Sequence, residues 1–244
     1  MVVIGIANGG AKRSEEYVPY VVNYRDIHIT GAGGSNFTRW VVEKCIPYIE
    51  KNYKVSDKRE DRAVMGSSLG GLISLWMTIN YPDVFSMAGV FSPHSPWLVE
   101  DLKNFEKKDV RIWMDGGTGE LGTANYNYTD SCRLMLATLM EKGYEYGKDL
   151  FYYEVYRAVH NEIDWARRVA YPFIMFKGKM DDIVLSDFEA IGQIMQFPFR
   201  NIKRIVNPVA DFKNGFRFSL YSLAKYRILK GKGVKINAIG ELAF

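Results

Sequence analysis

The stretch that decides the fold is Arg62-Ala-Val-Met-Gly-Ser-Ser-Leu-Gly-Gly-Leu72. It begins as a short apolar strand, passes through Gly66-Ser67-Ser68-Leu69-Gly70, and continues as a helix that starts near Gly70. A serine at the tip of such a sharp strand-to-helix turn has a strained backbone, so its neighbours must be small. We expect Gly66 and Gly70, two residues to either side, to leave that room.

The pattern G-x-S-x-G is typical of a nucleophile elbow, with Ser68 at its tip. The helix that follows directs its unpaired N–H groups and its positive dipole end toward the serine, where an oxyanion would develop. The pentapeptide also occurs by chance in glycine-rich loops, so the strand before it and the helix after it carry the prediction. We expect Ser68 to be the nucleophile and the backbone N–H of Leu69 to be an oxyanion donor.

Apolar runs alternate with helical patterns on both sides of this turn, from residue 2 to about residue 177. Strands are expected at 2–7, 63–65, 85–91, 110–114 and 150–156, and helices at 37–52, 70–80, 97–105, 129–142 and 162–176. This alternation predicts an α/β fold of the α/β-hydrolase type, with a doubly wound, mostly parallel sheet. Residues 2–7 are apolar throughout, which is typical of a strand buried on both faces. Residues 11–35 are expected to form a long loop, and Pro47 predicts a kink in the first helix.

The character of the chain changes beyond residue 177. Short β-like runs at 217–221, 226–229 and 234–242 are separated by Asn214-Gly215 and by Gly231-Lys-Gly233. We therefore expect an α/β-hydrolase domain at 1–180 and a small β-rich C-terminal segment at 181–244. The segment is similar to a partial immunoglobulin-like module.

Charge and composition exclude several classes of function. The 32 Lys and Arg residues are scattered among 28 Asp and Glu residues, giving a net charge of +4 without a basic block. This pattern indicates neither a nucleic-acid nor a membrane partner, and no apolar run reaches membrane-spanning length. The first residues lack a basic n-region, so we expect no signal peptide and a cytoplasmic location.

The few histidines and cysteines indicate no metal site and no cofactor. Cys45 and Cys132 lie on expected helices without C-x-x-C spacing, so we expect free thiols. The three histidines are also far apart in the sequence, and no group of them has the spacing of metal ligands.

Polar residues with catalytic chemistry follow three of the expected strands. In an open parallel sheet, functional residues gather at the carboxyl ends of the strands. Ser68 follows strand 63–65, an acidic residue follows strand 110–114, and His160 follows strand 150–156. The order serine, acid, histidine is that of α/β hydrolases.

Serine is a poor nucleophile near neutral pH, so His160 is expected to act as its general base. A carboxylate must then fix the tautomer of the imidazole and balance the charge of the imidazolium. Glu120 is the preferred acid. Asp115 remains the alternative, because it lies at the strand end, where it can instead hydrogen-bond the turn at Gly116-Gly117.

The remaining candidates have simpler explanations. His28 lies in the long loop before the serine and is expected to be solvated or structural. His94 follows the wrong strand for a base but can line the pocket. Glu162 and Asp164 are expected to be charges at a helix N-terminus.

The sequence also resembles the putative-esterase family of α/β hydrolases, which includes enterochelin-esterase-like proteins, esterase D and feruloyl or acetyl-xylan esterases. The resemblance covers residues 2–177. It rests on Val2-Val-Ile-Gly-Ile-Ala-Asn8, Arg13, Glu16-Tyr17, Gly66-Ser-Ser-Leu-Gly-Gly71, Tyr81-Pro-Asp-Val-Phe85, Ser92-Pro93, Trp97, Gly117-Thr-Gly-Glu120, His160-Asn-Glu162 and Trp165.

The resemblance implies the same nucleophile, acid and base as the strand order. It also implies that a loop containing Ser92, His94 and Trp97 borders the substrate pocket. Arg13 resembles a recurrent arginine of the family, which suggests a substrate contact, although a salt bridge to Glu16 is equally expected.

One departure from the family concerns the oxyanion hole. Family members usually carry three more strands ahead of Val2, and the loop after the last of these supplies the second oxyanion N–H. Three explanations remain open: the start of the sequence is incomplete, the C-terminal segment fills the gap, or a loop such as 8–11 supplies the donor. Losing one donor lowers turnover by a factor on the order of 100 to 1,000.

These observations predict a serine carboxylesterase that acts on a small-molecule ester without a cofactor. Two alternatives remain: a non-catalytic hydrolase remnant that acts as a binding protein, and an acyltransferase that uses an acceptor other than water. The sequence indicates neither the ester nor the oligomeric state.

Overall fold

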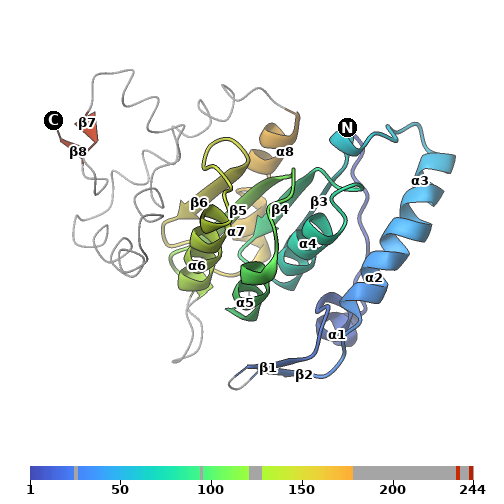
Figure 1. Cartoon of the computed structure of the whole chain (residues 1–244), viewed down its shortest axis with the longest axis horizontal. Helices are drawn as coiled ribbons and strands as arrows, with labels where there is room; N and C mark the ends of the chain where they lie inside the picture. The colour runs from blue at the N-terminus through green and yellow to red at the C-terminus, as the bar shows by residue number, and fades with distance from the viewer. Residues whose placement is uncertain (25–26, 94–95, 121–127, 178–234, 237–241, 244) are drawn as a thin grey trace.

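The computed structural model describes residues 1–24, 27–93, 96–120, 128–177, 235–236 and 242–243. Its centre is a four-stranded parallel sheet in the order β3-β4-β5-β6 (Figure 1). The strands are β3 (Ala63–Ser67), β4 (Met87–Phe91), β5 (Arg111–Gly117) and β6 (Leu150–Val155). The four strands lie within or extend the predicted runs, and the predicted α/β fold with a parallel sheet is confirmed.

Helices cover both faces of this sheet (Figure 1). One face carries α4 (Leu69–Asn80), α5 (Pro96–Asn104) and α6 (Tyr128–Glu141), and the other carries α8 (Ala170–Lys177). Alternation along β5 shows the division: Ile112 and Met114 pack with the first group of helices, whereas Trp113 packs with α8. Because helices cover both faces, β4 is buried at every position, and β5 and β6 are buried along most of their length, as expected for a parallel sheet.

The N-terminal segment differs from the prediction. Residues 2–7 form no strand, and Val2 and Val3 are 54% and 67% exposed. A strand needs a hydrogen-bonded neighbour, and within the described residues the edge strand β3 pairs only with β4. The prediction of a strand at 2–7 was therefore wrong, because an apolar run does not form a strand without a hydrogen-bonding neighbour.

The predicted loop at 11–35 contains regular structure. It holds η1 (Gly10–Lys12), α1 (Arg13–Tyr17) and an antiparallel pair formed by β1 (Val22–Tyr24) and β2 (Ile27–Ile29). In β2, His28 is exposed and its Nδ1 lies 2.6 Å from Asn23 Oδ1, consistent with the expected solvated or structural role.

A long helix follows this hairpin and lies toward the β3 side of the sheet (Figure 1). It is built from α2 (Gly34–Trp40), the π-helical η2 (Val41–Cys45) and α3 (Ile46–Asn52), and it matches the helix predicted at 37–52. The irregularity expected at Pro47 takes the form of the π-helical stretch just before it, because proline cannot donate the next helical hydrogen bond. The short η3 (Arg59–Asp61) then leads into β3.

The helix predicted at 162–176 is two helices. α7 (Glu162–Ala166) ends before Arg167, and α8 begins at Ala170. Pro172 lacks the N–H that would continue one helix across this point, but it fits the first turn of a new one. The interruption places Arg168 in the turn between the two helices.

The C-terminal segment is described only in part. β7 (Lys235–Ile236) pairs antiparallel with β8 (Leu242–Ala243), at the run predicted at 234–242. The runs at 217–221 and 226–229 lie outside the described residues, so the division at residue 180 stays a prediction.

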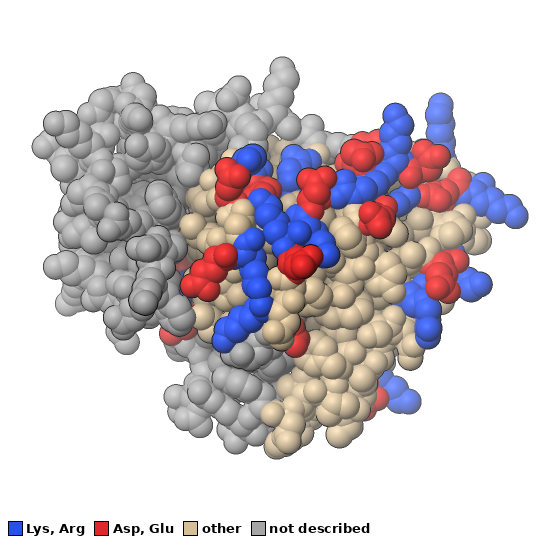
Figure 2. Space-filling model, in the orientation of Figure 1, with Lys and Arg blue, Asp and Glu red and all other residues tan. Residues whose placement is uncertain are grey.

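The described surface fits the expected mixture of charges. Figure 2 shows Lys and Arg side chains interleaved with Asp and Glu on the face that it presents. Within the described ranges, no helix has the length and hydrophobicity to cross a membrane, and no group of three potential metal ligands occurs.

Candidate functional site

Ser68 lies between β3 and α4 with φ 57° and ψ −123°, in a backbone region that non-glycine residues rarely adopt. Two hydrogen bonds hold this conformation. The Ser68 N–H donates to Phe91 O at 2.9 Å, and Ser68 O accepts from the Leu72 N–H at 3.0 Å. The expected sharp strand-to-helix turn is therefore present, anchored to β4 on one side and to α4 on the other.

Two glycines near Ser68 lie close to other backbone atoms. A Cβ on Gly66 would lie 2.6 Å from Gly70 C, and a Cβ on Gly71 would lie 3.1 Å from Phe91 O. At Gly70 itself, the nearest atom to an added Cβ is in the Tyr17 ring at 4.0 Å. The crowding expected at Gly66 is confirmed, but the crowded position downstream is Gly71 rather than Gly70.

The start of α4 supplies backbone donors next to Ser68. The first helical hydrogen bond is that of Leu72, so the N–H of Leu69 lies ahead of it at the positive end of the helix. Two N–H groups of the loop at 8–11 are engaged elsewhere: Gly9 donates to Glu16 Oε2 at 2.7 Å, and Gly10 donates to Asn8 Oδ1 at 2.9 Å. These two groups are therefore unsuited to serve as the second oxyanion donor.

Arg13 supports the turn from the outside. Its Nη2 donates to Ser67 O at 3.2 Å, and its guanidinium lies 5.5 Å from the centre of the Tyr17 ring. Glu16 accepts from a backbone N–H instead of forming the salt bridge that was one of the two expectations for Arg13. Arg13 thus contacts the residue directly before Ser68.

The register of the sheet aligns the carboxyl ends of β3, β4 and β5 along one edge. Ser67 pairs with Phe91, and Phe91 pairs with Asp115. Ser68 and Ser92 therefore leave neighbouring strands at the same edge, where β5 and β6 also end. This edge is the carboxyl edge, as expected for the functional site of a parallel sheet.

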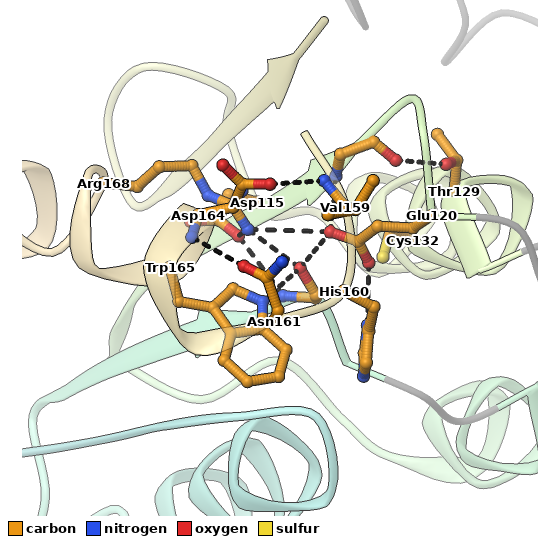
Figure 3. Close-up of polar contacts among 12 residues, drawn as sticks. Asp115, Glu120, Thr129, Cys132, Val159, His160, Asn161, Asp164, Trp165 and Arg168 are labelled. Atoms are coloured by element: carbon orange, nitrogen blue, oxygen red, sulfur yellow. Dashed lines mark hydrogen bonds and ion pairs between the residues drawn. The ribbon is translucent and has the colours of Figure 1, made fainter. Parts of the chain in front are cut away.

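At this edge, His160 Nδ1 lies 3.0 Å from Glu120 Oε2 (Figure 3). The Glu120 side chain is fully buried, whereas that of His160 is 23% exposed. The imidazole stacks on the Tyr128 ring at 4.7 Å between centres and meets the edge of Trp165 at 4.9 Å. With Nδ1 facing the carboxylate, proton transfer to or from a bound molecule would use Nε2.

Asp115 has a different environment. Its Oδ1 accepts from Arg168 Nη2 at 3.0 Å and from the Ser92 N–H at 3.2 Å, and its Oδ2 accepts from Trp113 Nε1 at 3.4 Å. Gly116 and Gly117 continue β5, so the turn expected to bind Asp115 does not form there. The structure brings Glu120 to His160 and leaves Asp115 on the other side of Ser92.

The loop that carries His160 is fixed on both sides. Asn161 caps α7 by accepting from the Asp164 N–H at 2.9 Å, and Asp164 Oδ2 accepts from the Val159 N–H at 2.7 Å. Glu162 and Asp164 lie in the first turn of α7, as expected for helix N-terminal charges. The Gly119 N–H donates to Ala158 O at 3.0 Å, which ties the His160 loop to the Glu120 loop.

Ser92 forms a buried junction of hydrogen bonds. Its Oγ donates to Glu120 Oε1 at 2.6 Å and accepts from Arg168 Nη2 at 2.9 Å and Trp165 Nε1 at 3.0 Å. Its φ of 41° turns the chain sharply at the end of β4. The hydroxyl capacity of Ser92 is used inside the protein and its side chain is buried, so a contact of this loop with the substrate stays a prediction. His94 lies outside the described residues, and Trp97 lies in α5.

Two contacts of the site were missed from the sequence: the Ser92 bridge to Glu120 and the cation Arg168. No spacing rule connects Arg168 to either strand end. One physical signal was available, because two acids expected at a single buried strand end require a nearby cation.

Burial has clear effects on acids near the site. It raises the pKa of the Asp115 carboxyl, an effect that Arg168 opposes. It also raises the pKa of the Cys132 thiol well above its ordinary value, so this buried free cysteine is a poor nucleophile. The predicted free thiols at Cys45 and Cys132 are confirmed.

A groove of about 820 Å³ lies between the N-terminal segment and α2. Its lining residues include Ile6, Lys12, Glu15, Phe37 and Trp40. None of the expected catalytic residues lines this groove, so we assign the candidate site from the side-chain geometry at the carboxyl edge of the sheet.

Comparison with known proteins gives a consistent family. The family model described as "Putative esterase" matches residues 1–171. The chain is 33% identical over 127 residues to "Uncharacterized protein YbbA" of Bacillus subtilis (strain 168), a match that covers 49% of this chain and 50% of that protein. It is 35% identical over 65 residues to the same organism's "Ferri-bacillibactin esterase BesA", covering 27% of this chain and 22% of BesA.

Among solved structures, the chain is similar to the enterobactin esterase FES from Shigella flexneri, with a TM-score of 0.51 and 21% identity. This match covers 58% of the chain and 38% of FES. The matches therefore span half or less of the length of these relatives, and the structural likeness concerns the fold.

Proposed function

The chain belongs to the Putative esterase family, and from this premise we propose that it is a serine carboxylesterase. Ser68 Oγ attacks the carbonyl carbon of an ester while His160 Nε2 takes the hydroxyl proton. The imidazolium then returns this proton to the leaving alcohol, and an acyl-enzyme remains on Ser68. Water, deprotonated by His160, attacks the acyl-enzyme and releases the acid.

The observation that carries this proposal is the hydrogen bond between His160 Nδ1 and the buried Glu120. A buried carboxylate at this position fixes the tautomer of the imidazole and stabilises the imidazolium that each proton transfer creates. Ser68 leaves its strand at the same edge of the sheet, ahead of a helix whose Leu69 N–H can donate to the oxyanion. An ordinary surface histidine would need no such partner.

The proposed substrate is a small-molecule carboxylic ester. The names of two relatives, a ferri-bacillibactin esterase and an enterobactin esterase, make siderophore esters the first natural candidates. The aromatic rings of Tyr128 and Trp165 on either side of the His160 imidazole are compatible with such a ligand.

The test is hydrolysis of p-nitrophenyl acetate, together with labelling by a fluorophosphonate probe and peptide mapping. We expect the wild-type protein to be labelled at Ser68. Ser68→Ala should lose both labelling and turnover, and His160→Ala should lose at least 100-fold in rate, the lower end of what a general base contributes. Full activity in Ser68→Ala would refute the mechanism. A folded wild-type protein that neither reacts with the probe nor turns over ester would instead favour a binding protein.

A further inference from the structure

Arg168 is a buried cation beneath the proposed site, although it does not touch His160. Its side chain is 2% exposed, and its Nη2 contacts both Ser92 Oγ at 2.9 Å and Asp115 Oδ1 at 3.0 Å. The same nitrogen lies 3.7 Å from Glu120 Oε1. Figure 3 shows Arg168 reaching from its turn toward Asp115 and Glu120, with His160 on the far side of Glu120.

The arrangement is a poor source of stability. Within the part of the chain that the structure describes, Nε and Nη1 of Arg168 are buried without a hydrogen-bond partner. An unsatisfied buried donor is unfavourable, and a buried ion pair seldom stabilises a protein more than apolar residues of the same volume. The guanidinium therefore contributes mainly through the positive charge and the contacts of Nη2, because its other two nitrogens form no hydrogen bonds within the described residues.

The charges explain why a cation is needed. Asp115 accepts hydrogen bonds from Arg168, Ser92 and Trp113, and Glu120 accepts them from Ser92 and from the Gly117 N–H at 2.8 Å. Burial raises the pKa of the Asp115 carboxyl, and the charge of Arg168 opposes this effect. Two carboxylates and one guanidinium carry a net charge of −1, and the imidazolium formed during catalysis would bring this buried group to neutrality.

We propose that Arg168 is a positioning residue of the esterase site: it balances the charge of Asp115 and, through the Ser92 hydroxyl that it shares with Glu120, keeps Glu120 aligned on His160 Nδ1. This inference rests on the proposed function for its catalytic consequence. Without Arg168, two buried carboxylates would share the site around Ser92. The two negative charges would then face each other without a cation, and the Ser92 hydroxyl would lose one of its two N–H donors.

The test is a double-mutant cycle with Arg168→Met, Asp115→Asn and the double variant. Each single variant changes the net charge of the buried group. We therefore expect kcat for p-nitrophenyl acetate to fall roughly 10- to 100-fold, which is part of the rate that a general base contributes. KM should change less than threefold. The double variant has a net charge of −1 again. It should recover to within about fivefold of wild type, as expected for two residues in contact, and the pH dependence separates a positioning role from a structural one.

The pH dependence gives a second readout. In Asp115→Asn, the buried group is neutral before catalysis, so the acidic limb of the kcat/KM profile should move to lower pH. In Arg168→Met, the buried group carries one more negative charge, which stabilises the imidazolium, so the limb should move to higher pH. In the double variant it should return to the wild-type position. Glu120, Tyr128 and Trp165, which contact the His160 ring, are unchanged in all of these proteins.

A readout that needs no activity is the NMR titration of the His160 ring signals, assigned with His160→Gln. The pH at which the His160 ring is half-titrated should be lowest in Asp115→Asn, intermediate in wild type and the double variant, and highest in Arg168→Met. If the wild-type protein lacks esterase activity but the ring signals follow this order, then the proposed function fails while the electrostatic coupling stands.

Two arginine variants serve as matched controls. Arg133 is a buried arginine whose Nε and Nη2 bind Glu154 at 2.9 and 2.8 Å, and Arg167 is an exposed neighbour of Arg168. Arg133→Met should lower thermal stability without moving the acidic limb, and Arg167→Met should change neither. Multiplicative losses in the double variant, or an acidic limb that stays in place in both single variants, would overturn the proposal, with circular dichroism establishing that each variant is folded.

Discussion

Gly66 and Gly70, which flank Ser68 in the G-x-S-x-G pattern, differ in how well they tolerate a larger side chain. Gly66→Ala would place a Cβ 2.6 Å from the backbone of Gly70, so the turn must shift. We expect it to lose about 1–3 kcal/mol in the free energy of unfolding, the range for overpacked sites, and to lower the rate of fluorophosphonate labelling. Gly70→Ala meets only the Tyr17 ring at 4.0 Å and lies inside α4. It should gain up to about 1 kcal/mol, because alanine favours helix.

Urea denaturation of both variants measures this difference, since the free energy of unfolding follows from each transition midpoint. A loss of stability in Gly70→Ala as large as that in Gly66→Ala would mean that the turn is tighter at Gly70 than the distances indicate.

At the same scale, strand order and residue type were enough to propose Ser68, His160 and an acid after the strand predicted at 110–114. The preference for Glu120 over Asp115 is supported by the contact of Glu120 with His160 Nδ1. The contacts beneath them were not predictable in this way. Ser92 was expected at the pocket because the loop that contains it resembles a pocket loop of the family, yet its hydroxyl is directed inward to Glu120. Arg168 reaches the site only because a helix breaks beside it, and side-chain contacts of this kind depend on packing in three dimensions.

At the scale of elements, the cap of α7 and the end of α6 offer a matched pair. Asn161→Ala removes the acceptor of the Asp164 N–H, and we expect it to lose about 1 kcal/mol, as is typical of N-caps. Because Asn161 directly follows His160, kcat/KM should also fall roughly tenfold, since a displacement of about 1 Å can lower a rate on the order of 100-fold.

The control is Gly143→Ala, at the end of α6. Gly143 has φ +94°, where a side chain introduces about 1–2 kcal/mol of strain. This variant should therefore lose at least as much stability as Asn161→Ala while keeping kcat/KM. Thermal melts and p-nitrophenyl acetate kinetics on both variants separate the two effects. Equal losses of activity would show that stability alone, rather than the position of the His160 loop, governs the rate.

The helices and strands that could be predicted are those whose hydrophobic pattern in the sequence agrees with the contacts that they make in the fold. The inner strands β4, β5 and β6 are mostly apolar and buried because helices cover both faces, so their pattern and their environment agree. Residues 2–7 have the same apolar pattern, but a strand also requires a hydrogen-bonding partner, which no local pattern reveals. The break between α7 and α8 follows from Pro172, whose effect depends on whether it falls in the first turn of a helix.

At the scale of the whole molecule, buried acids should make the protein sensitive to alkaline pH. Burial raises the pKa values of the Cys132 thiol and the Tyr152 hydroxyl well above their ordinary values of 9.0 and 10.0. Above pH 9, the unfolded chain therefore releases protons that the folded protein retains. Since stability falls with rising pH wherever the folded state binds more protons, the free energy of unfolding should decline by about 1.4 kcal/mol per pH unit for each such group.

Tyr152→Phe isolates one of these contributions. Near neutral pH the variant lacks the hydrogen bond from the Tyr152 hydroxyl to Glu154 Oε2, so it should be less stable by about 1 kcal/mol. Above pH 10 it lacks one group that titrates on unfolding, so its stability should decline less steeply and approach that of wild type. Urea denaturation between pH 7 and 11 measures both slopes, with Tyr48→Phe as the control because Tyr48 is exposed. If Tyr152→Phe and wild type declined in parallel, the Tyr152 proton would not be held by the folded core, and the alkaline sensitivity would have another origin.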